Sequence, residues 1–137
     1  MSEFTESVDA YVKEHFESEY GGLLANFKEI QAEQYLLFAK KNHDYGMRNV
    51  MAGSELETAD DVKFALTGLW FRISDKVSRW RNLLQKPNAV DGESLLDTMQ
   101  DIANYATIAQ MVARRMWKNE TSPYEVSTED CQEDTGE

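Results

Sequence analysis

Between residues 62 and 84, apolar side chains recur every three or four positions, which is the spacing of one face of a helix. This stripe consists of Val62, Leu66, Leu69, Ile73, Val77, Trp80 and Leu84. Thr58 or Asp60 is suited to cap the start of the helix. Pro87 ends it, because proline and the residue before it disfavour helical backbone. The pattern predicts a helix of about seven turns.

A second apolar face follows after a short connection that contains Pro87. It consists of Leu95, Leu96, Met99, Ile102, Ala103, Ala106 and Ala109. Asp91 is the expected N-cap, and the helix is expected to reach about Lys118. Because the connection is short, the two long helices are predicted to run antiparallel.

The N-terminal third predicts two further helices. One spans about residues 4–19 and ends at Gly21-Gly22, and the other spans about residues 24–41. The segment 42–46 is rich in turn residues, and Gly46 suits a positive φ. Residues 47–57 show no period and are expected to form a loop.

No stretch alternates like a strand, so the predicted fold is all-α: a helical bundle with two long antiparallel helices plus N-terminal helices. The length of 137 residues fits a single domain, assigned here to residues 1–118. Residues 119–137 carry seven of the 25 acids and no base, and are predicted to form an acidic disordered tail.

Charge and composition narrow the function. A formal net charge of −11 argues against binding to nucleic-acid backbones, which requires a basic surface. The single cysteine, Cys131, cannot form an internal disulfide. The chain has no apolar run long enough for a membrane span and no signal-peptide pattern, so a cytoplasmic protein without a membrane partner is expected.

One face of the helix predicted over residues 62–84 is polar. Arg72, Asp75, Arg79 and Asn82 fall within about 80° of one another around the helix axis. A solvated face with an Asp75–Arg79 pair would explain them, at a few tenths of a kcal/mol. Phe71 and Leu83 flank the stripe, however, so this side is not purely solvated.

The next helix carries a row of acids. Glu93, Asp97, Asp101 and Asn104 lie on one side of it. Like charges four residues apart repel, and neither capping nor the helix dipole explains Asp101, two turns into the helix. Carboxylates in such a row are typical of a Mg²⁺–phosphate site. A pair between Asp101 and Arg72 or Arg79 in a buried network is the alternative.

The segment 40–46 places cations, a carboxylate and an aromatic ring at one helix end. Lys41, Asp44 and Tyr45 are therefore candidate ligand-binding residues. The plain alternatives are a lysine placed for the helix dipole, a turn aspartate and a core tyrosine. No phosphate-binding glycine loop and no zinc-protease motif occurs in the sequence.

Three blocks of sequence, in this order, resemble the small helical phage and bacterial family called nucleotide modification associated domain 1. The blocks are Asp44-Tyr45-Gly46, then Arg72-Ile73-Ser74-Asp75-Lys76-Val77-Ser78-Arg79 with Asn82-Leu83-Leu84, then Glu93-Ser94-Leu95-Leu96-Asp97-Thr98-Met99-Gln100-Asp101-Ile102-Ala103-Asn104-Tyr105-Ala106. The resemblance covers about residues 26–115. It implies a role in phage nucleotide metabolism or DNA-base modification.

The helix order is more distantly similar to the MazG-like all-α nucleoside triphosphate pyrophosphohydrolases. Those enzymes hold Mg²⁺ with Glu-x-x-Glu on one helix and Glu-x-x-Asp on the next. Here the first motif is Arg72-x-x-Asp75, with a cation in place of a carboxylate, and the second is Asp97-x-x-x-Asp101, one residue longer. These departures argue against metal-dependent hydrolysis and leave two alternatives: weaker metal binding, or a pocket that binds phosphate through Arg72 and Arg79 without cleaving it.

Three functional hypotheses follow. The first is a Mg²⁺-dependent nucleoside triphosphate pyrophosphohydrolase, the second a module that binds a nucleotide without chemistry, and the third a structural oligomer without ligand. In the first, the catalytic residues are Asp75, Lys76 and Arg79, and the metal ligands are Glu93, Asp97 and Asp101. The predicted substrate-binding residues are Lys41, Asp44, Tyr45, Arg72, Asn82, Asn104 and Tyr105.

The predicted core face of residues 95–109 leaves three apolar side chains on another side of the helix, namely Tyr105, Ile108 and Val112. Soluble monomers avoid wet apolar surface of this extent. The sequence therefore predicts a homodimer or larger assembly through the two long helices.

Overall fold

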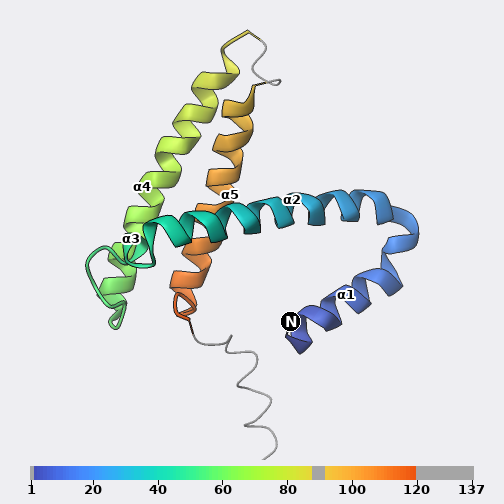
Figure 1. Ribbon diagram of the computed structural model, residues 1–137, viewed down its shortest axis with the longest axis horizontal. Coiled ribbons are helices and arrows are strands. Elements are labelled where there is room, and N and C mark those ends of the chain that lie inside the picture. The colour runs from blue at the N-terminus through green and yellow to red at the C-terminus, as the bar shows by residue number, and fades with distance from the viewer. Residues whose placement is uncertain (1, 88–91, 120–137) are drawn as a thin grey trace, which may run out of the picture. The chain divides into compact units, whose positions relative to one another are not determined.

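The computed structural model describes residues 2–87 and 92–119, and every regular element in these ranges is a helix. The all-α prediction is confirmed. The elements are α1 (Glu3–His15), α2 (Glu17–Tyr45), α3 (Arg48–Met51), α4 (Ala59–Leu84) and α5 (Glu93–Ala113) (Figure 1). None of the described helices is long and apolar enough to span a lipid bilayer.

The chain divides into two compact parts. Of the described residues, one part contains residues 2–32 with 118–119, and the other contains residues 33–87 and 92–117. The prediction of one domain over residues 1–118 stays a prediction. The predicted disordered tail lies outside the described residues except for Asn119.

The first part contains α1 and the beginning of α2. Ser2 caps α1, since its hydroxyl oxygen accepts a hydrogen bond from the backbone N–H of Thr5 at 3.2 Å. The predicted break at Gly21-Gly22 is wrong: the chain leaves helical geometry at Phe16 (φ −128°) and again at Tyr20 (φ −122°), and both glycines are helical. Glycine permits a break but does not impose one.

In the second part, α2 continues through residues 42–45, beyond its predicted end. It stops at Gly46, whose φ of 75° confirms the predicted left-handed backbone. The expected loop 47–57 contains the short helix α3, whose Val50 is buried. The sequence pattern did not predict this helix, because a helix with only one buried side chain shows no apolar periodicity.

The two long helices α4 and α5 pack against each other as the predicted antiparallel hairpin (Figure 1). A capping box starts α4: the Thr58 hydroxyl accepts from the Asp61 N–H at 3.1 Å, and the Asp61 carboxylate accepts from the Thr58 N–H at 3.3 Å. The predicted end of α4 at Leu84 is confirmed.

The buried face of α4 is shorter than its apolar stripe. Val62, Ala65 and Leu69 are buried, whereas Val77 and Leu84 are about half exposed. The main core lies where α3 and Trp117 cover the hairpin, and it consists of Val50, Val62, Ala65, Leu69, Ile108, Val112 and Trp117. Further along α4, fewer elements are present to cover the stripe.

The sequence prediction for α5 needs three corrections. Gly92 is its N-cap, and the predicted cap Asp91 lies outside the described residues. The helix ends at Ala113 and not at Lys118, because Arg115 takes a positive φ of 60°.

The core face of α5 is also rotated from its predicted position. The buried side chains are Leu95, Thr98, Ile108 and Val112, while Leu96 is exposed. Ile108 and Val112 belong to the core of one chain, so they no longer support the prediction of an oligomer. When the apolar stripe of a helix is wide, its sequence does not show which side of the stripe packs against the neighbouring helices.

Candidate functional site

A pocket of about 470 Å³ lies where the end of α2 meets α3, α4 and α5, entirely within residues 33–117. Its charged lining consists of Lys41 from α2, Arg72 and Lys76 from α4, and Asp101 from α5. The remaining lining residues are Phe38, Asn42, Tyr45, Gly46, Asn49, Val50, Asn104, Tyr105, Ile108 and Trp117. We call this hollow the charged pocket.

Asp101 is the centre of an ion-pair network that joins three helices. Its Oδ1 accepts from Lys41 Nζ at 2.7 Å, and its Oδ2 accepts from Lys76 Nζ at 2.9 Å. The side chain of Asp101 is 14% exposed, against 46% for Lys41 and 32% for Lys76. Asp101 is thus paired with two lysines. The alternative predicted from the sequence, a pair with Arg72 or Arg79, is wrong.

The network shifts two pKa values. Burial raises the pKa of Asp101, but hydrogen bonds and positive charge from Lys41 and Lys76 outweigh it, so the pKa lies below its usual value. Burial lowers the pKa of Lys41, and the hydrogen bond and charge of Asp101 outweigh this, so the pKa lies above its usual value. Both groups are therefore charged at neutral pH.

Arg72 is held by a different set of contacts. Its Nη2 donates to the backbone oxygen of Asn49 at 3.0 Å and lies 3.5 Å from Asn49 Oδ1. The guanidinium carbon lies 5.9 Å from the centre of the Tyr105 ring. Within the described part of the chain, Arg72 forms no ion pair with a carboxylate. Its positive charge in the pocket lining is therefore not neutralised by an acidic side chain.

Aromatic and amide groups complete the walls. The Phe38 and Trp117 rings meet edge to face with centroids 6.1 Å apart, and Trp117 Nε1 donates to the Met47 carbonyl at 3.0 Å. Asn104 Nδ2 donates to the Gln34 carbonyl at 3.2 Å, which leaves its Oδ1 as an acceptor. Tyr45 is 70% exposed and is one of the lining residues.

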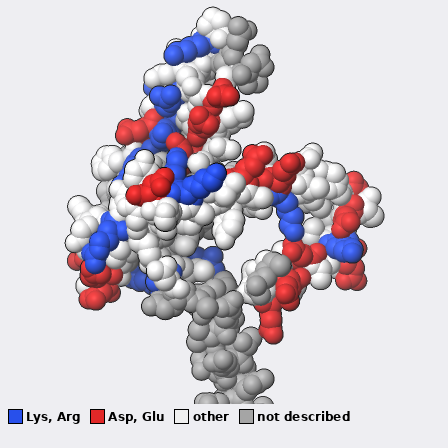
Figure 2. Space-filling model, in the orientation of Figure 1, with Lys and Arg blue, Asp and Glu red and all other residues white. Residues whose placement is uncertain are grey.

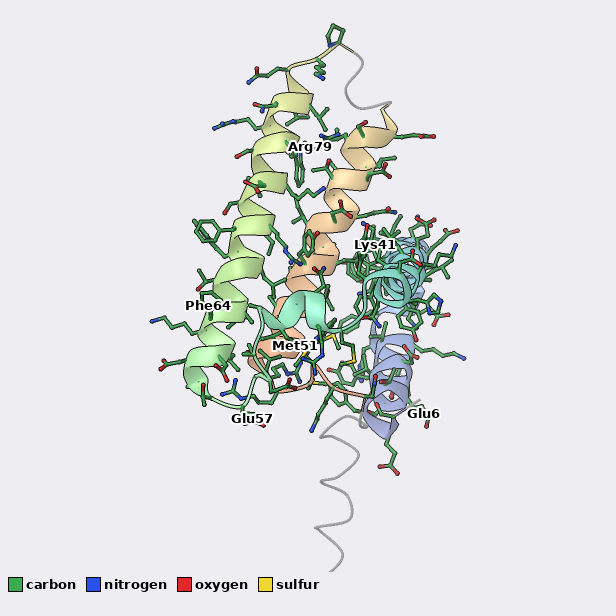
Figure 3. All side chains as sticks on the ribbon, turned by 60° about the vertical axis from the view of Figure 1, so that its left-hand side comes forward. Glu6, Lys41, Met51, Glu57, Phe64 and Arg79 are labelled. Carbon is green, nitrogen blue, oxygen red and sulfur yellow. The ribbon has the colours of Figure 1, made fainter. Side chains whose placement is uncertain are left out.

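Seven of the thirteen site residues predicted from the sequence line the charged pocket. They are Lys41, Tyr45, Arg72, Lys76, Asp101, Asn104 and Tyr105. Figure 3 labels Lys41, on α2 beside the hairpin, and Arg79, nearer the connection that follows α4.

The other six predicted residues are exposed and outside the lining: Asp44, Asp75, Arg79, Asn82, Glu93 and Asp97. Arg79 shares a helix face with Arg72, but seven residues place it about 10 Å further along the axis. The sequence analysis grouped Arg72 and Arg79 by their angle around the helix axis and did not consider their separation along that axis. The catalytic roles of Asp75 and Arg79 stay predictions without support from the pocket.

The predicted metal ligands do not form a cluster. Within residues 2–87 and 92–119, no group of three acidic, histidine or cysteine side chains is placed to hold a metal ion. Glu93 and Asp97 are exposed, and both oxygens of Asp101 accept from ammonium groups. The described carboxylates therefore do not fit the predicted three-carboxylate Mg²⁺ site, and Mg²⁺ binding rests on the sequence pattern alone.

Sequence reasoning missed several lining residues. Asn42 is adjacent to Lys41 and was within the segment already singled out, so its amide was available as a signal. Asn49 and Trp117 gave no such signal. Asn49 lies in the segment that was expected to be a loop, and Trp117 lies beyond the apolar face predicted for residues 95–109. Their roles depend on contacts with residues far away in sequence, Arg72 and Met47.

Comparison of the chain with protein-family models, with curated proteins and with solved structures gave no match. Membership of the nucleotide modification associated domain 1 family, and likeness to MazG-like enzymes, stay predictions from the residue blocks. The charged pocket is therefore interpreted from its own chemistry.

Proposed function

We propose that the charged pocket binds a nucleotide, with Arg72, Lys41 and Lys76 at the phosphate and the aromatic walls at the base. The observation that carries this proposal is the composition of the lining: three cations and one carboxylate. The whole chain has 14 basic and 25 acidic residues, so a local excess of cations runs against its composition. An anionic ligand accounts for this excess.

The cations retain the hydrogen bonds that a phosphate needs. Each ammonium has three donors, and the contacts to Asp101 use one from Lys41 and one from Lys76. The hydrogen bonds of Arg72 to Asn49 involve Nη2, which leaves Nη1 and Nε for a ligand. Guanidinium groups bind phosphate oxygens in pairs, with charge-assisted bonds stronger than neutral ones.

The walls suit a flat heterocycle. Aromatic side chains stack on nucleobases with a gain of about 1–3 kcal/mol per base. Tyr45 offers its exposed ring, and the Asn42, Asn49 and Asn104 amides line the same hollow. A pocket of this volume falls in the range of about 300–1,000 Å³ that is usual for small-molecule sites.

The mixed surface of the hairpin fits a small ligand better than a nucleic-acid backbone. On its visible face, Lys and Arg side chains lie among acidic ones and do not form a continuous basic surface (Figure 2). Backbone binding needs cations arranged along a stripe or patch. The lining itself holds three cations against one carboxylate, which supports binding of a small anionic ligand such as a free nucleotide.

Binding without chemistry is the version that the geometry favours. A carboxylate that accepts from two ammonium groups is poorly placed to hold Mg²⁺ or to activate water, and Asp101 is the only carboxylate of the described lining. Hydrolysis of a nucleoside triphosphate with Mg²⁺ stays a prediction from the sequence.

The test is calorimetric titration with the 5′-monophosphates and 5′-triphosphates of the common ribo- and deoxyribonucleosides, supported by thermal shift. Arg72→Gln should weaken the best ligand at least about tenfold, since hydrogen bonds to charged groups contribute ~1.5–3 kcal/mol. Arg79→Gln is the matched control: it makes the same charge change on the same helix, outside the lining, and should leave the affinity within about twofold.

Absence of binding by the whole panel would refute the proposal, as would an equal loss of affinity in both variants. The same panel with Mg²⁺, read for pyrophosphate release, tests the hydrolase hypothesis separately. Release that depends on Asp101 would favour that hypothesis over binding alone.

A further inference from the structure

The lining of the charged pocket has a defined net charge. Lys41, Arg72 and Lys76 contribute three positive charges and Asp101 one negative charge. The neighbouring acids Asp44, Asp75 and Asp97 are exposed and do not line the pocket, so solvent screens them. The described side chains of the pocket thus carry a net charge of two positive units.

We propose that the pocket selects a nucleotide that carries two negative charges, as a nucleoside monophosphate does, and that Asp101 sets this number by cancelling one of the three cations. This inference rests on the proposed nucleotide binding. It makes Asp101 a specificity-determining residue, whose role is to limit the charge of the ligand.

Charge balance is the physical reason. A phosphate monoester carries about −1.5 to −2 charges at pH 7, which matches the lining. A metal-free triphosphate carries roughly four negative charges. It therefore leaves an excess of negative charge next to Asp101, and like charges in contact repel. A nucleoside brings none and leaves the cations of the pocket without a counter-charge.

Geometry supports the same role for Asp101. Its carboxylate fixes the ammonium groups of Lys41 and Lys76 at 2.7 Å and 2.9 Å from its two oxygens. Both ammonium groups therefore stand on one side of the hollow, and Arg72 is fixed separately by Asn49. Because all three cations line the same pocket, they are the partners available to a bound phosphate group.

The decisive experiment compares the monophosphate and the triphosphate of the best-binding nucleoside by calorimetry, in buffer with a chelator. Mg²⁺ is excluded because it cancels two charges of a triphosphate. Wild type should bind the monophosphate more tightly. Asp101→Asn raises the net charge of the lining to three and should shift the affinity ratio toward the triphosphate by about tenfold, the size expected for one charge at contact distance in a partly solvated site.

Asp97→Asn is the matched control, because it lies one turn earlier on α5, is exposed, and removes the same charge from the chain. It should leave the ratio unchanged. Lys76→Gln, which lowers the lining charge to one, should shift the ratio further toward the monophosphate. These opposite shifts keep the test valid if one of the variants folds poorly.

The pH dependence in wild type is an independent readout. Protonation of the ligand's phosphate near pH 6 should weaken monophosphate binding as the pH falls from 7.5 to 5. The titratable and charged groups of the lining are Lys41 and Tyr45 from α2, Arg72 and Lys76 from α4, and Asp101 and Tyr105 from α5. The described lining includes no histidine, and His43→Gln, at an exposed position outside the lining, should leave the profile unchanged.

Tighter binding of the metal-free triphosphate by wild type would overturn the inference and leave the proposed function standing. An unchanged ratio in Asp101→Asn, or a flat pH profile, would overturn it in the same way. Failure of every nucleotide to bind would instead overturn the proposed function and this inference together.

Discussion

Asp101 shows how one side chain connects the stability of the fold with the chemistry of the site. It lies two turns into α5, where its charge has no favourable interaction with the helix itself. Its cost is offset by the ammonium groups of Lys41 and Lys76, which come from two other helices. The same contacts that tie α2 to the hairpin therefore shape the charge of the pocket.

We expect Asp101→Asn to lower the free energy of unfolding at pH 7 by about 1–2 kcal/mol, between the values of exposed and fully buried ion pairs. The folded pKa of Asp101 lies below its usual value, so its contribution is present above about pH 4 and disappears as the pH falls through the folded pKa. Urea unfolding at pH 7 and pH 3 measures the difference.

At pH 3 the stability gap between wild type and Asp101→Asn should be much smaller than at pH 7. Asp97→Asn, exposed and one turn away, should have no more than a few tenths of a kcal/mol effect at either pH. A gap that is constant with pH would show that the carboxylate charge does not stabilise the fold.

At the scale of single elements, predictions from sequence were good where the signal is local. The start of α4 at Thr58, its end before Pro87 and the left-handed Gly46 depend on neighbouring residues and are all confirmed. The rotation of the α5 core face and the helix α3 were missed, because they depend on which distant element covers them.

The same division holds for the site. Helical spacing identified Asp101 as unusual, since neither capping nor the helix dipole explains its charge, and it placed Arg72 on a polar face flanked by apolar residues. It could not show that Lys41, 60 residues before Asp101, supplies the partner. Spacing also grouped Arg79 and Asp97 with them, because residues one or two turns apart share a face without sharing a pocket.

The capping box of α4 is open to a direct test. Thr58→Ala removes the acceptor for the Asp61 N–H and should cost about 1 kcal/mol of stability, as measured by the urea midpoint. Thr67→Ala is the control on the same helix: its hydroxyl bonds back to the Lys63 carbonyl, and alanine is the better helix former. It should be neutral or slightly stabilising. Equal losses in both variants would argue against the capping box.

At the scale of the whole molecule, much apolar surface is exposed along α4. Trp70, Val77 and Leu84 are each more than half exposed, and because they recur every seven residues they lie in a row along one side of the helix. This surface now supports the expectation of a homo-oligomer, in place of Ile108 and Val112, which are buried within one chain. Scattered apolar residues are ordinary on monomers, but a row along one helix is typical of an interface.

We expect a second copy of the chain to cover this row, with a dimer or larger mass in light scattering at micromolar concentration. Trp70→Glu should shift the mass toward the monomer, because it places a charge in the row. Glu57→Gln, which changes a charge outside the row, should leave the mass unchanged. A monomeric wild type would refute the prediction.

The ion pair between Lys41 and Asp101 also has a consequence for the order of folding. The two residues are 60 positions apart, and Asn104 and Gln34, which join the same helices, are 70 apart. The α4–α5 hairpin, by contrast, closes through a short connection, and its contacts require little loss of chain entropy. We expect the hairpin to form early and α2 to dock late, so the pocket is the last feature to be completed. A ligand would then act mainly by slowing unfolding, because the contacts that it stabilises are absent from the folding transition state.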